Sequence, residues 1–204
     1  MKSKTQMNNE QLTNLLYECL ETELGGVQVY KTALLCAVNK DLKEEWETYL
    51  EQTQNHVEIV QRVCEQLAID PEVETAGRKV VRMIGQSLVR AMETALSEGN
   101  DGAAQIVAAE CVVEAETKDH LNWELLGYAA KKMRGDEAKI IQDAVSEVEE
   151  EEDEHLYHSS GWARELWIES LGMPAVLPPP EEERDVKSAI AAARAKQDRE
   201  KMAS

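Results

Sequence analysis

Glycine and proline are scarce in this chain, which has only ten of the one and five of the other among its 204 residues. Both residues interrupt helices, so their scarcity favours helices over strands. The sequence also lacks the long uncharged apolar run that a membrane-spanning helix requires, and we find no signal peptide. We therefore expect an all-α protein of the cytoplasm that is not inserted in a membrane.

Paired cysteines are absent as well, because Cys19, Cys36, Cys64 and Cys111 form no C-x-x-C motif. This spacing excludes a rubredoxin-like site of four paired cysteines, and we expect the thiols to stay reduced. Any electron donor for redox chemistry must then be another molecule, whose identity the sequence does not give.

Positive charge is in short supply, since 22 lysines and arginines stand against 40 aspartates and glutamates, for a formal net charge of -18. Contacts to phosphate depend on lysine and arginine, so we expect neither nucleic acid nor an anionic membrane as a partner. The excess of acid is compatible with attracting metal cations, but surface solvation explains such an excess equally well.

The spacing of apolar residues predicts four long amphipathic helices. They cover residues 10–39, 41–68, 103–133 and 137–170. Asp41 is the expected N-cap of the second. The short connections make the first two helices antiparallel neighbours, and likewise the last two, while a shorter helix at 77–96 lies in the long crossover between these hairpins.

The last of these helices carries ionisable residues on its apolar face. Glu151, Glu152, His155 and His158 share that face with Ile141, Ala144, Val148, Trp162 and Leu166. Burying an unpaired carboxylate costs several kcal/mol or forces it to be neutral, so such a group needs a counter-charge. A metal ion is the usual one.

The first two helices offer further candidates. Glu23 lies in the middle of the apolar face of 10–39, and His56 lies on the apolar face of 41–68. Glu21 is predicted to point away, into solvent. A lone buried histidine is more often a core residue with a hydrogen-bond partner, and it is the coincidence of candidates on several helices that favours a metal site.

A faint internal repeat relates the two hairpins. Glu23 is followed seven residues later by Tyr30, and Glu116 is followed at the same distance by Trp123. The third helix is apolar on more than one side, so Glu114 is an alternative to Glu116 as the inward carboxylate. We favour Glu116 because of the repeat. The tyrosine is predicted to pack in the core with its hydroxyl bonded to a partner.

These features resemble the ferritin-like superfamily of di-iron carboxylate four-helix bundles. The segment Glu23-Leu-Gly-Gly-Val-Gln-Val-Tyr30 is similar to the first-helix motif of that family, and Glu152-Asp-Glu-His155 is similar to its last. The crossover helix makes the rubrerythrin-type and bacterial stress-response members the nearest. The resemblance covers roughly residues 10 to 170 and implies a set of metal ligands. They are Glu23, His56, Glu116, Glu152 and His155.

Thr53 departs from the family pattern. Aligning His56 with His155 places Thr53 where the second hairpin has Glu152, and a hydroxyl is a poor replacement for a carboxylate that balances two cations. The site then holds two metals with altered ligation, holds one, or has decayed. His120 lies one turn beyond Glu116 and is a candidate extra ligand that would compensate.

The resemblance implies two iron or manganese ions and possible oxidase or peroxidase activity on dioxygen or hydrogen peroxide, in stress defence. The alternative is a non-enzymatic helical stress or interaction protein with an incomplete or structural metal site. We expect a homodimer. The domain division is a polar arm at 1–9, the ferritin-like bundle at 10–171, and a tail at 172–204 of a Pro-rich spacer and a charged, loosely associated helix.

Overall fold

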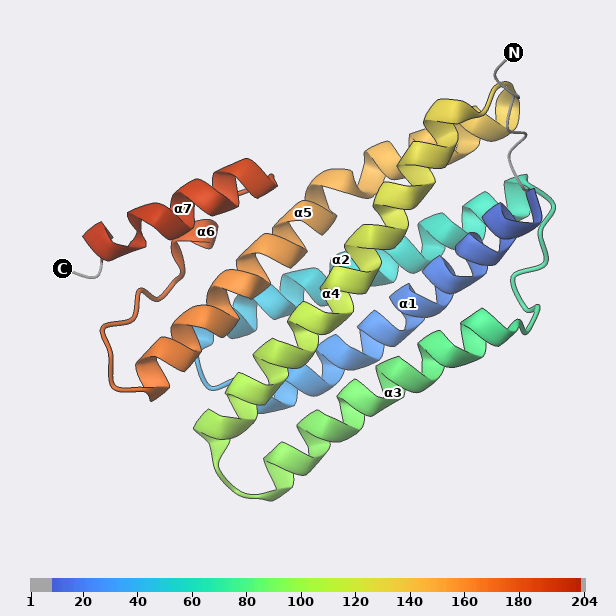
Figure 1. Ribbon diagram of the computed structural model, residues 1–204. Helices are drawn as coiled ribbons and strands as arrows, with labels where there is room; N and C mark the ends of the chain where they lie inside the picture. The colour runs from blue at the N-terminus through green and yellow to red at the C-terminus, as the bar shows by residue number, and fades with distance from the viewer. Residues whose placement is uncertain (1–8, 203–204) are drawn as a thin grey trace, which may run out of the picture.

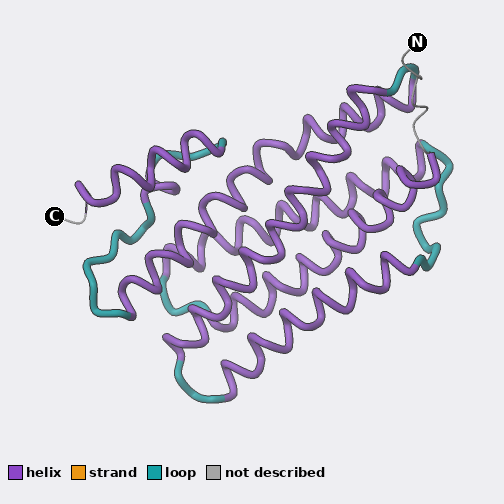
Figure 2. The backbone as a smooth tube through the Cα atoms, viewed as in Figure 1, coloured by secondary structure: helices purple, strands orange, loops and turns teal. Residues whose placement is uncertain are grey.

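A computed structural model of the protein describes residues 9–202. Every regular element in this part of the chain is a helix, as Figure 2 shows. In chain order they are α1 (Asn9–Cys36), α2 (Lys40–Gln66), α3 (Ala76–Ser97), α4 (Asp101–Lys132), α5 (Asp136–Ser170), α6 (Pro180–Glu183) and α7 (Ala189–Met202). The predicted all-α class is confirmed. The predicted arm at 1–9 lies outside the described residues, except for Asn9, which begins α1.

The five long helices lie side by side in one bundle (Figure 1). α1 and α2 form one antiparallel pair and α4 and α5 another, and the pairs meet through contacts of α1 with α4 and of α2 with α5. α2 and α4 run in the same direction, so the chain must return the length of the bundle between them. α3 makes that return and packs against α1 and α4.

The turn between α1 and α2 is capped by Asn39, so the predicted cap at Asp41 is wrong. The side-chain Oδ1 of Asn39 accepts hydrogen bonds from the backbone N–H groups of Asp41 at 2.9 Å and of Leu42 at 3.2 Å. Oε1 of Gln105, on α4, accepts from the backbone N–H groups of Val38 and Asn39. The turn is therefore fixed to the other hairpin as well.

The apolar core consists of two clusters with a polar layer between them along the bundle. One cluster gathers residues near the α1–α2 turn, including Trp46 and Trp162. The other gathers residues at the opposite end, including Leu16, Ile59 and Ile141. The residues of α1, α2, α4 and α5 that lie between the clusters in sequence include all of the predicted metal ligands.

Glu21 is buried, and the prediction that it points into solvent is wrong. Nε of Arg78 donates to its Oε2 at 2.7 Å, and Nε of Arg82 donates to its Oε1 at 2.7 Å. Both arginines lie on α3. The prediction failed because α1 is covered on two sides, by the other hairpin and by the crossover helix.

The C-terminal segment packs against α5, which corrects the expectation of a loosely associated tail. Arg164 on α5 makes two hydrogen bonds of 2.7 Å with the carboxylate of Glu181 on α6. Nε of Arg199 on α7 donates to Oε1 of the fully buried Glu165 at 2.6 Å. Val186, between the two short helices, is buried too. These contacts join both ends of the segment to one long helix.

Rising pH is expected to weaken the docking of this segment through Glu182. Burial, and then the charge of Glu45 on α2, raise the pKa of Glu182 to about 8 from 4.5. A carboxyl group with a raised pKa in the docked state stabilises docking below its ordinary pKa, and this contribution is lost as pH rises toward about 8. Asp41 adds to the repulsion.

Hydrogen exchange of α6 and α7 measures this effect. Protection is expected to fall at least roughly tenfold between about pH 5 and about pH 8.5, after correction for intrinsic exchange. Glu182→Gln is the matched control, because it keeps the shape of the side chain and removes its titration. A fall of the same size in Glu182→Gln would show that another group is responsible.

Three large apolar side chains of α3, those of Val80, Met83 and Ile84, are exposed. Such exposure is compatible with the expected homodimer, which stays a prediction. Within the described residues, no helix combines the length and the apolar character needed to cross a membrane.

Candidate metal centre

The polar layer of the bundle is a cluster of buried carboxylates and imidazoles. Each of the helices α1, α2, α4 and α5 supplies at least one of these side chains from its inward face. Five of the six predicted ligands are buried, with relative exposures of 3% or less. They are Glu23 of α1, His56 of α2, Glu116 of α4, and Glu152 and His155 of α5.

The five residues form two groups that share one carboxylate. Glu23, His56 and Glu152 place one potential ligand atom each within 4.8 Å of one another, and so do Glu116, His155 and Glu152. Glu152 Oε1 lies 3.1 Å from His56 Nδ1 and 3.8 Å from His155 Nδ1. Glu152 is therefore placed between the two halves of the cluster.

Both imidazoles are oriented by a contact at Nε2, the ring nitrogen on the side away from Glu152. His56 Nε2 lies 2.7 Å from Glu151 Oε2, and His155 Nε2 lies 2.8 Å from Gln52 Oε1. Carboxylate and amide oxygens accept hydrogen bonds, so in a neutral ring Nε2 carries the proton. Nδ1 then presents its lone pair to the cluster, as metal-binding histidines do.

The two outer carboxylates are each held by an aromatic residue of the other hairpin. Nε1 of Trp123 on α4 donates to Oε1 of Glu23 on α1 at 2.7 Å. The hydroxyl of Tyr30 on α1 donates to Oε1 of Glu116 on α4 at 2.7 Å. The seven-residue repeat of the sequence thus has a structural meaning, because each aromatic residue fixes the carboxylate of the opposite helix.

The remaining atoms of the cluster face one another without hydrogen-bond partners. Among the described residues these buried atoms include Glu23 Oε2, His56 Nδ1, Glu116 Oε2, Glu152 Oε2 and His155 Nδ1. Buried polar atoms in native proteins nearly always have a partner, and unpaired ones mark an ion or another group. The donor set and its orphaned atoms fit metal ions held by oxygen and nitrogen.

The carboxylates also repel one another. Burial, and then the charges of Asp119 and Glu152, raise the pKa of Glu23 well above its usual range. Burial, followed by the charge of Glu116, raises the pKa of Glu152 to about 8. Raised pKa values mean that the protonated carboxyl groups are favoured. Divalent cations would oppose this, because they favour the ionised form of every carboxylate around them.

Thr53 does not present its hydroxyl to the cluster. Its Oγ1 donates to the backbone carbonyl of Tyr49 at 2.8 Å, one turn back on α2. Its methyl group packs beside Gly26, where an added Cβ would lie 3.2 Å from Thr53 Cγ2. The position that would supply a second central carboxylate in the family pattern therefore supplies an ordinary helix contact.

Two other predicted positions lie outside the two groups. Glu114 is exposed and lines a cavity together with residues of α1 and α3, whereas Glu116 is buried. His120 is partly exposed, and its Nε2 lies 2.8 Å from Asp153 Oδ1. The repeat thus indicated the correct inward carboxylate of α4, and the structure places His120 beside an acidic residue of α5 instead of among the five.

A ring contact and then hydrogen bonds lead from the cluster toward the α1–α2 turn. The ring of Tyr49 lies against that of His155, with centroids 4.2 Å apart, and its hydroxyl bonds to Glu45 Oε1 at 2.5 Å. His158 Nδ1 lies 3.0 Å from the same hydroxyl. His158 therefore lies outside the group of five and contacts Tyr49, whose ring packs against His155. Glu151, predicted to be fully inward, is about one-third exposed.

Sequence reasoning missed Asp119. This residue is 4% exposed and belongs to a third group with Glu23 and Cys19. Burial, and then the charges of Glu152 and Glu116, raise its pKa well above the usual value. Its position three residues after Glu116 places both on one face of α4, and that spacing was the available signal.

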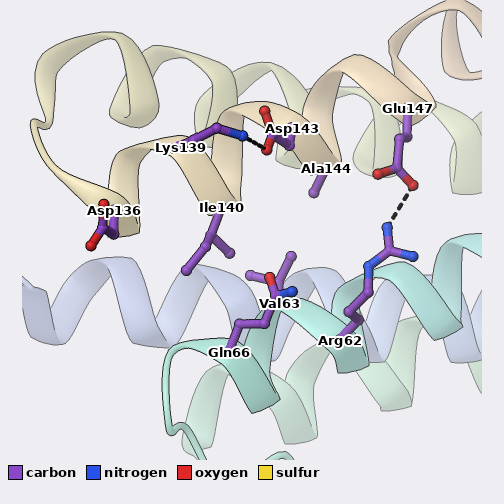
Figure 3. Close-up of a pocket in the computed structure, with 9 residues that line it drawn as sticks. All are labelled: Arg62, Val63, Gln66, Asp136, Lys139, Ile140, Asp143, Ala144 and Glu147. Carbon is purple, nitrogen blue, oxygen red and sulfur yellow. Dashed lines mark hydrogen bonds and ion pairs between the residues drawn. The ribbon is translucent and has the colours of Figure 1, made fainter.

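Two cavities differ in their relation to the cluster. One of about 310 Å³ lies between α4 and α5 and is lined by residues that include Trp123, His120 and Glu152. The other, of about 340 Å³, lies between α2 and α5 (Figure 3). An ion pair of 2.5 Å between Arg62 and Glu147 crosses it, and no predicted site residue lines it. Of these two cavities, only the first is lined by a residue of the cluster, Glu152.

Comparisons with protein-family models, with curated proteins and with solved structures found no match to this chain. Its function must therefore be argued from the buried carboxylates and imidazoles themselves.

Proposed function

We propose that the polar layer binds two divalent metal ions, with Glu152 as the carboxylate that bridges them. Glu23 and His56 would hold one ion, and Glu116 and His155 the other. The observation that carries this proposal is the sharing of Glu152 by two groups, each of which contains one further carboxylate and one imidazole.

Iron and manganese are the metals that this donor set favours. Oxygen ligands suit hard cations, imidazole suits iron, and the absence of sulfur from the two groups argues against the softest metals. Three protein ligands for each ion leave positions open for an exogenous molecule, as catalytic metal sites require.

The arrangement supports membership of the ferritin-like superfamily. Two helical pairs are joined by a crossover that carries a helix, and each pair contributes a carboxylate and a histidine to the space between them. In that family, one Glu from each of two helices and a Glu-x-x-His from each of the other two bind the metals. This chain has one Glu-x-x-His, Glu152 to His155, and Thr53-x-x-His56 in place of the other.

We propose that the protein catalyses the reduction of hydrogen peroxide or dioxygen. Reduction of hydrogen peroxide to two waters needs two electrons and two protons, and two ferrous or manganous ions held by these residues would supply one electron each. The cavity beside Trp123 and Glu152 gives a small oxidant its approach. The hydroxyl of Tyr30, whose oxygen lies 2.7 Å from Glu116 Oε1, donates its proton to that carboxylate and fixes it in place. Such a reaction would serve stress defence.

The second candidate function is a non-enzymatic helical protein whose metal site is incomplete or structural. Thr53 favours it, since its hydroxyl is bonded within α2 and the carboxylate count stays one short of the family pattern. Three carboxylates from Glu23, Glu116 and Glu152 leave two divalent ions with a net positive charge. The two candidates differ in whether metal is bound and whether it reacts.

Anaerobic reconstitution with ferrous iron separates them. The protein is expected to retain about two iron ions per chain after desalting, and to oxidise about two per hydrogen peroxide consumed. Iron content and ferrous iron remaining after a peroxide titration are the measurements. Retention of less than about half an ion would defeat the two-metal proposal, whereas two retained ions that fail to react would support the structural role.

A further inference from the structure

The polar layer extends past Glu23 on the side away from His155. Cys19 Sγ, a carboxylate oxygen of Glu23 and one of Asp119 lie within 4.8 Å of one another. Cys19 precedes Glu23 by one turn of α1, and Asp119 follows Glu116 by nearly one turn of α4. The three groups are thus arranged in a row, with Glu23 shared by the first two and Glu152 by the last two.

The group of Cys19, Glu23 and Asp119 is buried and contains two unsatisfied atoms. Cys19 and Glu23 are inaccessible to solvent, and Asp119 is 4% exposed. Asp119 Oδ1 has no hydrogen-bond partner among the described residues, and neither has Glu23 Oε2. Two carboxylates side by side in an apolar core repel each other unless a cation or a proton lies between them.

The spacing suits a metal ion. Bonds of about 2.0 to 2.3 Å to a tetrahedral ion separate the ligand atoms by about 3.3 to 3.8 Å, so modest rotations of these side chains would close the site. The donor set also differs from that of the other two groups, because it offers sulfur and lacks imidazole. Thiolate ligands favour softer divalent ions such as zinc or cobalt over iron and manganese.

We propose that Cys19, Glu23 and Asp119 form a third metal position, which takes one divalent ion as a thiolate–carboxylate complex. Binding breaks the S–H bond of Cys19, forms a metal–sulfur bond and releases the proton to solvent, with no change of oxidation state. The position shares Glu23 with the proposed two-metal centre but does not require an ion there.

Asp119 also contributes to the charge balance of the polar layer. With Thr53 at the place of the missing carboxylate, the layer holds Glu23, Glu116 and Glu152 against two divalent ions. Asp119 and the Cys19 thiolate bring two further negative charges for the third ion. Three divalent ions with these five negatively charged side chains would carry a net charge of +1. Two divalent ions with the three carboxylates of the two-metal centre would carry the same net charge.

Titration of the chelator-treated, full-length protein with Co²⁺ tests the proposal. Cobalt bound to thiolate gives a near-ultraviolet charge-transfer band that carboxylate and imidazole ligands do not give. We expect this band in the wild-type protein, with about three cobalt ions per chain. Cys19→Ser should lose the band and one ion, while Cys64→Ser should behave like wild type. Cys64 is the matched control, since it is equally buried in the same core cluster as Cys19.

Asp119→Asn gives a test that leaves the thiol in place. It is expected to raise the cobalt concentration at half-maximal band intensity at least roughly tenfold, with an unchanged circular dichroism spectrum. A wild-type protein that binds two ions without the band would overturn the third position and leave the centre at Glu152. A band that survives in Cys19→Ser would overturn it as well. A Cys19-dependent band with a single bound ion would support this position and defeat the two-metal centre.

Discussion

Glu152→Gln is expected to abolish tight binding at both metal positions of the proposed centre. Glu152 is the one residue that belongs to both groups, and its carboxylate lies between the two imidazoles. Glutamine keeps the shape of the side chain but removes the negative charge and one metal-binding oxygen. Each affinity should therefore fall at least about 100-fold, measured by equilibrium dialysis with Fe²⁺ or Mn²⁺.

Two further variants make this result specific. Glu150→Gln changes an exposed residue of the same helix and should leave both affinities unchanged. Glu116→Gln removes a ligand of one group only, so it should weaken one position at least about tenfold and the other much less. If Glu152→Gln weakened only one position, the bridging role of this carboxylate would be wrong.

Metal loading is expected to raise the melting temperature by about 10 to 20 °C. The metal-free protein buries several carboxylate oxygens and two imidazole nitrogens without partners, and unfolding returns them to water. Saturation at about 100 times the dissociation constant stabilises the fold by about 2.7 kcal/mol for each ion. Two ions give about 5 kcal/mol, and each kcal/mol shifts the melting temperature of a protein of this size by about 2 to 4 °C.

Differential scanning calorimetry with and without Mn²⁺, after treatment with chelator, measures this shift. Manganese is suitable because it avoids oxidation during heating. The Glu152→Gln variant should show almost no metal-dependent shift, and its metal-free form should melt no lower than metal-free wild type, since it buries one fewer ionisable group. A wild-type shift below about 2 °C would contradict tight binding to the folded state.

The arrangement of long helices could be predicted from the sequence because it follows from a local pattern. Apolar residues recur with the helical period, and short connections leave the partner helices little choice but to pair. The repeat of Glu23–Tyr30 and Glu116–Trp123 also pointed to the inward face of α4, where apolar spacing alone was ambiguous.

Features that depend on a second layer of packing could not be predicted in this way. Glu21 faces α3 and its two arginines, and a helical face read from α1 alone does not reveal a second neighbour. The C-terminal helix has little apolar character, and it is held through Arg199 and the buried Glu165, which are far apart in sequence. Asp119 was overlooked for a related reason, because its neighbours Cys19 and Glu23 come from another helix.

The crossed hydrogen bonds of Tyr30 and Trp123 tie the site to the pairing of the two halves of the bundle. Each hairpin carries a carboxylate that is aimed correctly only when the aromatic residue of the other hairpin is in place. Neither hairpin alone therefore holds its carboxylate by the hydrogen bond seen in the complete bundle. If the chain arose by duplication of one hairpin, the two carboxylates would have acquired these hydrogen bonds only when the two copies packed together.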